Sequence, residues 1–308
     1  MSGVADWESA PSLIDGAMTA ELTAADCGVA YWLGAVPQGT LRGHVYGHGP
    51  EAVTPAFMRE PGPLNEALTQ ELAFRSIAED KATRALGHLV ALAPDTASME
   101  FYATQLIDEA RHAMVFRTHM EELTRTPPDV SADREKILVP LEEFGLRALR
   151  DRRDFIGGVI ILTVLVEGVL APAAELSERK WRPLDPAAAD VERGAGIDEI
   201  RHLVVGSSIA REHLLARPDE RPRLLELIED GHRLWATLPT QDMVYRRELL
   251  FQEGLRAHAG LVGDYEIWPG RRLADTTPEE RLETALEWSG RMQRTRLDYM
   301  GLSSGGTT

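Results

Sequence analysis

The chain has 308 residues, a formal net charge of −16 and a sequence pI near 5.0, an acidic balance without the basic footprint that a nucleic-acid binder needs. Its single cysteine, Cys27, excludes an intramolecular disulfide framework and fits a reducing compartment. Because no charged-then-apolar signal sequence opens the chain, we expect a cytoplasmic protein with neither a nucleic acid nor a membrane as its partner.

Along the chain, the pattern of apolar residues is mainly helical. Residues 1–60 lack a regular period and are expected to form an irregular N-terminal extension that wraps a helical core. From about residue 64, apolar residues recur at three- and four-residue spacing, and proline-containing turns separate the periodic segments. The sequence predicts helices over 64–92, 98–124, 133–151, 154–180, 186–216, 220–237, 241–259 and 278–299.

These segments predict one all-α domain that covers the whole chain, because no long linker or low-complexity tract divides it. Residues 61–240 would form a helical bundle. Residues 241–308 would add C-terminal helices that either cover this bundle or form the interface of a homodimer. The longest apolar run, 159–166, is too short to span a bilayer.

A six-residue motif occurs twice, as IDEARH at residues 107–112 and, ninety residues later, as IDEIRH at residues 197–202. In each copy, glutamate and histidine are three residues apart, so they lie on one side of a helix, about one turn from each other. Such a pair offers one oxygen and one nitrogen ligand to a metal ion. A single E-x-x-H match is weak, as the isolated pair Glu229 and His232 illustrates, but two copies that share the same Asp and Arg are far more specific.

Both copies lie on helix faces that otherwise carry apolar residues. Burying a carboxylate and an imidazole there costs free energy unless their charge is compensated. A polar pair satisfied at a helix interface is one solution, and a metal ion is the other. The repetition of the motif favours the metal ion.

Two metal ions shared by four helices need one more carboxylate from each of the two remaining helices. In an antiparallel helix pair, residues equally far from the turn lie level with each other. With a turn at Pro94, the residue level with Glu109 is Glu79. Glu71 is the alternative on the same helix, but eight residues place it about 12 Å along the axis from Glu79.

The same arithmetic applies to the second motif. With a turn at Pro183, the residue level with Glu199 is Glu167. This glutamate also interrupts the apolar stretch VIILTVLVEGVLA, where a carboxylate has no structural reason to be. The sequence therefore predicts Glu167 as the fourth carboxylate ligand.

The predicted ligand set resembles that of the ferritin-like diiron carboxylate proteins, the dinuclear oxidases and oxygenases built on a four-helix bundle. The residues that carry the resemblance are Glu79, Glu109-x-x-His112, Glu167 and Glu199-x-x-His202, and the matching region covers residues 64–216. The resemblance implies two iron ions bridged by Glu109 and Glu199 and capped by one histidine each. Glu79 and Glu167 would be terminal ligands.

The resemblance also implies roles for the residues beside the ligands. Asp108 and Asp198 would each accept a hydrogen bond from the histidine of the other motif, which fixes its tautomer and its ligating nitrogen. Arg111 and Arg201 would balance the buried carboxylates, although an arginine at helical spacing is often only part of a surface ion pair.

The donor set fits the expected cofactor and co-substrate. Four carboxylates and two neutral imidazoles match two ferrous ions in net charge, and this mixture suits iron or manganese better than structural zinc. Two ferrous ions supply two electrons to O2, while the protein supplies geometry and a dry pocket for a small-molecule substrate. Because the sequence has no flavin or iron–sulfur motif, further electrons would come from an external donor or from the substrate.

Three residues near the motifs are candidates to line a substrate pocket: Phe116, Thr163 and Gly206. Phe116 occupies the position at which ribonucleotide reductase small subunits carry a radical-bearing tyrosine, so that radical role is not expected. Glycine at position 206 indicates either close helix packing or room for a substrate.

Length, the N-terminal extension and composition are similar to those of diiron oxygenases of bacterial natural-product pathways. The nitrogen-oxidising members of this group include azoxy-forming enzymes of the valanimycin type. We therefore expect N-oxygenation of an amine or hydrazine. The arylamine N-oxygenases carry a further histidine ligand where this chain has Ala195. Hydroxylation or desaturation of carbon, and a non-catalytic ferroxidase-like iron-binding protein, are the alternatives.

Other histidines are not expected in the metal centre. His119 lies two turns, about 10 Å, beyond His112 along its helix and is too far away to bind the same ions. His44 and His48 belong to the stretch GHVYGHGP, which is expected to be a flexible loop.

Overall fold

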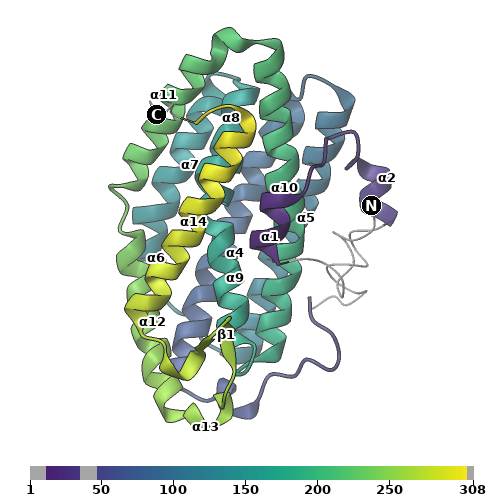
Figure 1. Cartoon of the computed structure of the whole chain (residues 1–308). Coiled ribbons are helices and arrows are strands. Elements are labelled where there is room, and N and C mark those ends of the chain that lie inside the picture. Colours follow the sequence, from purple (N-terminus) through teal and green to yellow (C-terminus); the bar gives the residue numbers. More distant parts are fainter. Residues whose placement is uncertain (1–11, 35–46, 304–308) are drawn as a thin grey trace.

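The computed structural model describes residues 12–34 and 47–303, and this part of the chain is almost entirely helical (Figure 1). The prediction of an all-α protein is confirmed. The bounds of the long helices agree with the sequence pattern to within about three residues: α4 (Pro63–Leu92), α5 (Thr96–Leu123), α10 (Pro186–Ala216), α11 (Arg221–Trp235), α12 (Thr240–Ala257) and α14 (Pro278–Met300). A 3-10 turn, η5 (Pro218–Glu220), precedes α11.

Local capping contacts explain why the sequence predicts these helix bounds closely. Asp95 accepts a hydrogen bond from the Ser98 N–H at the start of α5. Thr277 begins α14 with a capping box, in which its side chain accepts from the Glu280 N–H. Such contacts satisfy N–H groups that have no partner within the helix. Pro63 at the start of α4 needs no such partner because proline has no N–H.

The two helices predicted over 133–151 and 154–180 are interrupted by π-helical turns. The first consists of α6 (Ser131–Asp133), η2 (Arg134–Leu138), α7 (Val139–Leu146) and η3 (Arg147–Asp151). The second consists of α8 (Phe155–Ile160), η4 (Ile161–Glu167) and α9 (Gly168–Trp181). π-helical turns within α-helices are rare and often mark functional sites. Here one of them ends at a predicted metal ligand, Glu167.

The long helices form one bundle with the C-terminal helices against its side. Helices α4 and α5 pack as an antiparallel pair, α9 packs on α10, and α10 also contacts α5. Helix α12 packs on α4, and α14 packs along α9 and α10 (Figure 1). The C-terminal helices α12 and α14 therefore contact the bundle of their own chain.

The N-terminal extension is more regular than the sequence pattern indicated. It contains α1 (Leu13–Thr19), α2 (Val29–Gly34) and the 3-10 turn η1 (Ala56–Arg59). Helix α1 is short but amphipathic, and its buried residues Leu13, Ile14 and Ala17 pack against α10 and α14. Because α1 has only seven residues, tertiary packing rather than intrinsic propensity stabilises it. His44 lies outside the described residues.

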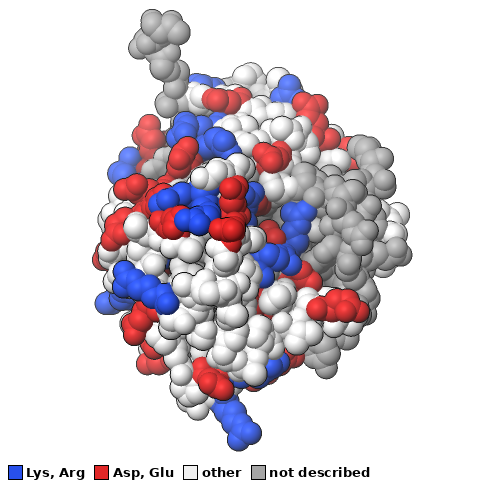
Figure 2. All heavy atoms as spheres, turned by 60° about the horizontal axis from the view of Figure 1, so that its bottom comes forward, with Lys and Arg blue, Asp and Glu red and all other residues white. Residues whose placement is uncertain are grey.

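A short β-hairpin connects the last two helices. It follows α13 (Ala259–Val262) and consists of β1 (Glu266–Trp268) paired antiparallel with β2 (Arg271–Arg272), before the 3-10 turn η6 (Leu273–Asp275). On the face of the molecule shown in Figure 2, acidic and basic side chains are interspersed rather than gathered by sign.

The described residues include one helical segment, Phe155–Trp181, that is long and apolar enough to cross a membrane by length and composition. Most of its apolar window is buried inside the protein, as in the core helix of a bundle. The π-helical turn η4 and the buried Glu167 both lie within this segment.

Candidate metal centre

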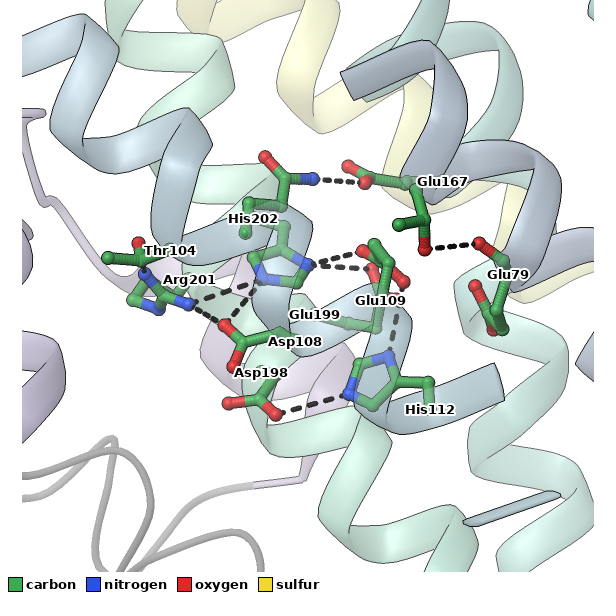
Figure 3. Close-up of polar contacts among 12 residues, drawn as sticks. Glu79, Thr104, Asp108, Glu109, His112, Glu167, Asp198, Glu199, Arg201 and His202 are labelled. Carbon is green, nitrogen blue, oxygen red and sulfur yellow. Dashed lines mark hydrogen bonds and ion pairs between the residues drawn. The ribbon is translucent and has the colours of Figure 1, made fainter. Parts of the chain in front are cut away.

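The six predicted ligands meet in the interior of the bundle, brought there by four helical segments (Figure 3). Their ligand atoms form two overlapping groups, one of Glu79, Glu109 and His112 and the other of Glu109, Glu167, Glu199 and His202. Within each group, the ligand atoms lie within 4.8 Å of one another. The hairpin arithmetic therefore identified glutamates that do lie beside the repeated motifs.

Glu109 is the member that the two groups share. Its Oε2 lies 3.1 Å from Nδ1 of His112, and its Oε1 lies 3.1 Å from Nδ1 of His202. Figure 3 shows both rings turned toward this carboxylate. Glu199, which the resemblance implies as a second bridging residue, belongs to the group of His202 only, with its Oε2 3.7 Å from Nδ1 of that ring.

Each histidine contacts the aspartate of the other motif. Nε2 of His112 lies 3.1 Å from Oδ2 of Asp198, and Nε2 of His202 lies 3.3 Å from Oδ2 of Asp108. When the ring is neutral, as a metal ligand must be, a carboxylate beside Nε2 favours the proton on that nitrogen and leaves the Nδ1 lone pair toward the glutamates. The crossed contacts thus orient both rings for a ligand bound at Nδ1.

The two arginines of the motifs also face the interior. Arg201 is 1% exposed, its guanidinium contacts Asp108, and its Nη1 donates a hydrogen bond to Thr104 Oγ1 at 3.0 Å. Arg111 donates from Nη1 to Asp108 Oδ1 at 3.1 Å and lies 3.8 Å from Asp198. Arg201 is therefore part of a buried charge network rather than of a surface ion pair.

Two further side chains contact the centre without having been predicted. Gln105 donates from Nε2 to Glu167 Oε1 at 2.5 Å. It lies one turn before Glu109 on α5, so helical spacing alone could have indicated it. Trp32 donates from its indole N–H to Asp108 Oδ1 at 2.8 Å, and the guanidinium of Arg111 lies over its ring. Trp32 comes from the N-terminal extension, where no sequence pattern pointed to the centre.

Burial and mutual charge determine the protonation of the cluster. Burial raises the pKa of Glu79 and of Glu167 well above its ordinary value, and the charges of neighbouring glutamates add to this effect. Burial also acts against ionisation of Glu109, but hydrogen bonds from the two histidines hold its pKa well below the usual range. For His112 and His202, burial is outweighed by hydrogen bonds to acidic partners, and the pKa is raised well above normal. Protons on these glutamates and histidines thus reduce the net negative charge of the buried cluster.

The cluster leaves two carboxylate oxygens without a hydrogen-bond partner in the described part of the chain. They are Oε2 of Glu167 and Oε2 of Glu199, and both are buried. A buried polar atom without a partner costs free energy. Since both atoms belong to predicted metal ligands of one group, a bound metal ion would supply the missing partner, and the residues present fit such an ion.

A third group of ligand-type side chains lies apart from this centre. His119 belongs to it together with His48 and Glu122, and their ligand atoms also lie within 4.8 Å of one another. The rings of His48 and His119 are 6.2 Å apart between centroids. His119 thus shares no group with His112, in keeping with its distance along α5, and His48 packs against the bundle instead of forming a free loop.

A cavity of about 710 Å³ opens beside the candidate metal centre. Four of the predicted ligands line it, namely Glu79, Glu109, Glu167 and Glu199. Most of the remaining wall is apolar and comes from α4, the segment from η4 to α9, α12 and α14, with Leu162, Val166, Leu170, Met243 and Leu286 among the lining residues. Ala195, at the position of the additional histidine ligand of arylamine N-oxygenases, also lines this cavity.

None of the three predicted pocket residues lines this cavity, because each packs elsewhere in the core. A Cβ atom at Gly206 would overlap the Thr163 hydroxyl, so the glycine permits close helix packing and opens no space for a substrate. Phe116 is fully buried under the guanidinium of Arg75, at 5.5 Å from the ring centroid. Of the two interpretations of Gly206, the structure supports close helix packing.

Glu71, the alternative to Glu79, belongs to a separate charge network. Its carboxylate accepts hydrogen bonds from Lys180 Nζ at 3.4 Å and from the Trp181 indole at 3.2 Å, and lies 3.7 Å from Arg75. Burial opposes ionisation, but the charges of Lys180 and Arg75 lower the pKa of Glu71 to about 2. Glu71 is thus occupied by structural contacts, and Glu79 is the residue of α4 that lies in the cluster.

We expect Glu192→Gln to change the pH dependence of folding stability. Glu192 is buried 3.0 Å from Arg75, and burial raises its pKa to about 7, from an ordinary value of 4.5. Its ionisation therefore costs the folded state free energy that accumulates as pH rises from 4.5 to 7. The free energy of unfolding of the wild type should fall by about 3 kcal/mol relative to the glutamine variant over this range.

Urea denaturation at pH 5 and pH 8 would measure this difference. Glu121→Gln, which changes an exposed glutamate on α5, should follow the wild type at both pH values. An offset between Glu192→Gln and wild type that is the same at pH 5 and pH 8 would contradict the prediction.

The centre therefore consists of two adjacent groups of oxygen and nitrogen donors that share one carboxylate, next to a mainly apolar cavity. Such a donor set suits divalent iron or manganese. No protein-family model matches the chain.

Proposed function

We propose that this chain is a non-haem diiron oxygenase with a ferritin-like four-helix bundle, formed by α4, α5, the segment from α8 to α9, and α10. The observation that carries the proposal is the position of Glu109. Its two carboxylate oxygens each lie 3.1 Å from Nδ1 of a histidine, one from each copy of the repeated motif. A carboxylate shared in this way is what two adjacent ions with one histidine each require.

The choice of iron rests on the donors. Glu79, Glu109 and His112 would hold one ion, and Glu109, Glu167, Glu199 and His202 would hold the other. Cysteine is absent from this set, and carboxylates outnumber imidazoles, which favours iron or manganese over structural zinc. When bound, two ferrous ions supply two electrons to O2, the proposed co-substrate.

The chain's own residues would orient the ligands and exclude water. Asp108 and Asp198 hold the protons on Nε2 of the two histidines, so that both Nδ1 atoms stay directed at the glutamates. Gln105 fixes the orientation of the Glu167 carboxylate through a hydrogen bond to Oε1. The mainly apolar wall of the cavity limits water at the centre, which protects an oxidant from side reactions.

The cavity favours an enzyme acting on a small molecule over a ferroxidase-like iron-binding protein, since iron storage needs no apolar chamber of about 710 Å³ beside the ligands. We propose N-oxygenation of an amine or hydrazine, with azoxy formation as one product type. A hydroxylase or desaturase acting on carbon is the second candidate, because the same cavity would accept the substrate of such an enzyme. The remaining electrons would come from an external donor or from the substrate itself.

Anaerobic loading of the metal-free protein with ferrous iron tests the proposal. We expect about two iron ions per chain and, after mixing with O2, a transient visible absorption band. Amines and hydrazines that are substrates should speed the decay of this band and give oxidised products by mass spectrometry. A chain that holds no stoichiometric iron, or that retains zinc in its place, would contradict the proposal. Oxygen consumption that no substrate alters would favour the iron-binding alternative.

A further inference from the structure

One cation on the wall of the cavity has two nitrogens without a hydrogen-bond partner in the described residues. Arg247 of α12 is 7% exposed, and its Nε and Nη2 donate to no acceptor in the described part of the chain. Its guanidinium lies over the Phe74 ring, 4.9 Å from the centroid. Arg247 forms a long ion pair with Asp133, whose Oδ2 lies 3.7 Å from Nη2, and the other oxygen of Asp133 accepts a hydrogen bond from Arg246.

The other cations around this part of the cavity have close acidic partners. Lys180 donates to Glu248 at 2.8 Å, Arg281 also contacts Glu248, and Arg75 lies 3.0 Å from Glu192. The set contains four buried or half-buried cations, Arg75, Lys180, Arg247 and Arg281, and four carboxylates, Glu71, Glu192, Glu248 and Asp133, the last of which also pairs with a fifth cation, the exposed Arg246.

Arg247 is the cation of this set whose closest ion-pair contact is longest, 3.7 Å to an aspartate that it shares with Arg246, so its charge is the least compensated. Burial lowers its pKa to about 10, so the guanidinium still carries its charge at neutral pH. Burial also raises the pKa of Glu192 to about 7, so one of the four carboxylates is only partly ionised there. A buried charge of this kind is costly unless an anion accompanies it.

The distance along α4 between this cation and the candidate metal centre indicates how long a bound ligand would be. Arg247 lies at the level of Phe74 on α4, and Glu79 follows Phe74 by five residues on the same helix. Five residues of α-helix correspond to a rise of about 8 Å. Apolar residues that line the same cavity include Val166, Leu170 and Val244.

We infer that the cavity binds an amphipathic carboxylate, whose anionic group pairs with Arg247 and whose apolar body extends toward Glu79 and Glu167. A guanidinium matches a carboxylate with two parallel hydrogen bonds, and the unpartnered Nε and Nη2 are suited to donate them. The inference deepens the proposed function and rests on it only for the reaction at the end of the ligand that lies near Glu79 and Glu167. For amine oxidation, the substrate class would be an amino carboxylate with an apolar spacer of about 8 Å between its two polar groups.

Calorimetric titration of the metal-free protein with octanoate tests the binding without any reaction. We expect wild-type protein to bind octanoate, and the isosteric but uncharged octanamide at least about tenfold more weakly. Arg247→Gln should reduce octanoate affinity to that of octanamide while leaving octanamide binding unchanged. Arg247→Lys should give an intermediate affinity, because an ammonium lacks the planar fork.

Arg256→Gln is the matched control, since it changes an exposed arginine of the same helix that does not line the cavity. It should bind octanoate as the wild type does. Unchanged octanamide binding in Arg247→Gln shows that the cavity is still folded. No binding of octanoate to wild type, or equal affinities for wild type and Arg247→Gln, would overturn the inference. Because no iron is present, neither outcome depends on whether the proposed diiron chemistry is correct.

Discussion

Glu109→Ala is expected to abolish the stoichiometric binding of both iron ions, the largest effect of any single substitution in the cluster. Glu109 is the one residue that belongs to both groups of ligand atoms, and each of its oxygens lies 3.1 Å from a histidine Nδ1. Its removal deprives each ion of a charged ligand at once. Colorimetric iron analysis after anaerobic loading and desalting would give the number of ions retained per chain.

Two variants make this result specific. His202→Ala removes a ligand from one group only, so it should lose one ion and weaken the other less. Glu121→Ala changes an exposed glutamate on the same helix and should retain the wild-type iron content. Circular dichroism should show an unchanged helix content for all three. Retention of two ions by Glu109→Ala would refute the assignment of the shared ligand.

Arg201→Met should lower the free energy of unfolding by about 3–5 kcal/mol, as expected when one partner of a buried ion pair is removed. Arg201 is 1% exposed and contacts Asp108, which is fully buried. Methionine fills similar space but leaves Asp108 with Arg111 as its remaining arginine partner. Urea denaturation of the metal-free variant would measure the loss.

An exposed arginine on the same helix provides the comparison. Arg211 lies on α10, with its guanidinium 5.0 Å from the centroid of the Tyr299 ring. Arg211→Met should change stability by about 0.5 kcal/mol or less. If Arg201→Met changed the free energy of unfolding as little as Arg211→Met, the buried contact with Asp108 would not be a significant source of stability.

Helix bounds and the residues that meet in the candidate centre were predictable because both depend on short-range patterns. Capping residues such as Asp95 and Thr277 satisfy helix ends locally and so appear in the sequence next to the elements that they start. The glutamate–histidine pairs share one turn of helix, and a short connection fixes which residue of the neighbouring helix lies level with them. Glu79 followed from Glu109 in this way.

The remaining features depend on contacts between distant segments. Trp32 reaches Asp108 across 76 positions of sequence, and Arg247 lies over Phe74 only because α12 packs on α4. The role of Gly206 depends on Thr163, which belongs to the π-helical turn η4. Periodicity did not distinguish this π-helical turn from a regular helix, because both place apolar residues on one face.

Two parts of the chain contribute different kinds of residue to the cavity. All six predicted metal ligands lie between residues 79 and 202, whereas part of the wall around Arg247 comes from α12 and α14. Substitutions in these two C-terminal helices can therefore alter the shape and charge of the chamber without changing any donor atom. A lineage that keeps the repeated motif fixed and lets α12 and α14 diverge would change which molecules the chamber accepts while conserving the cluster of ligand-type side chains beside it.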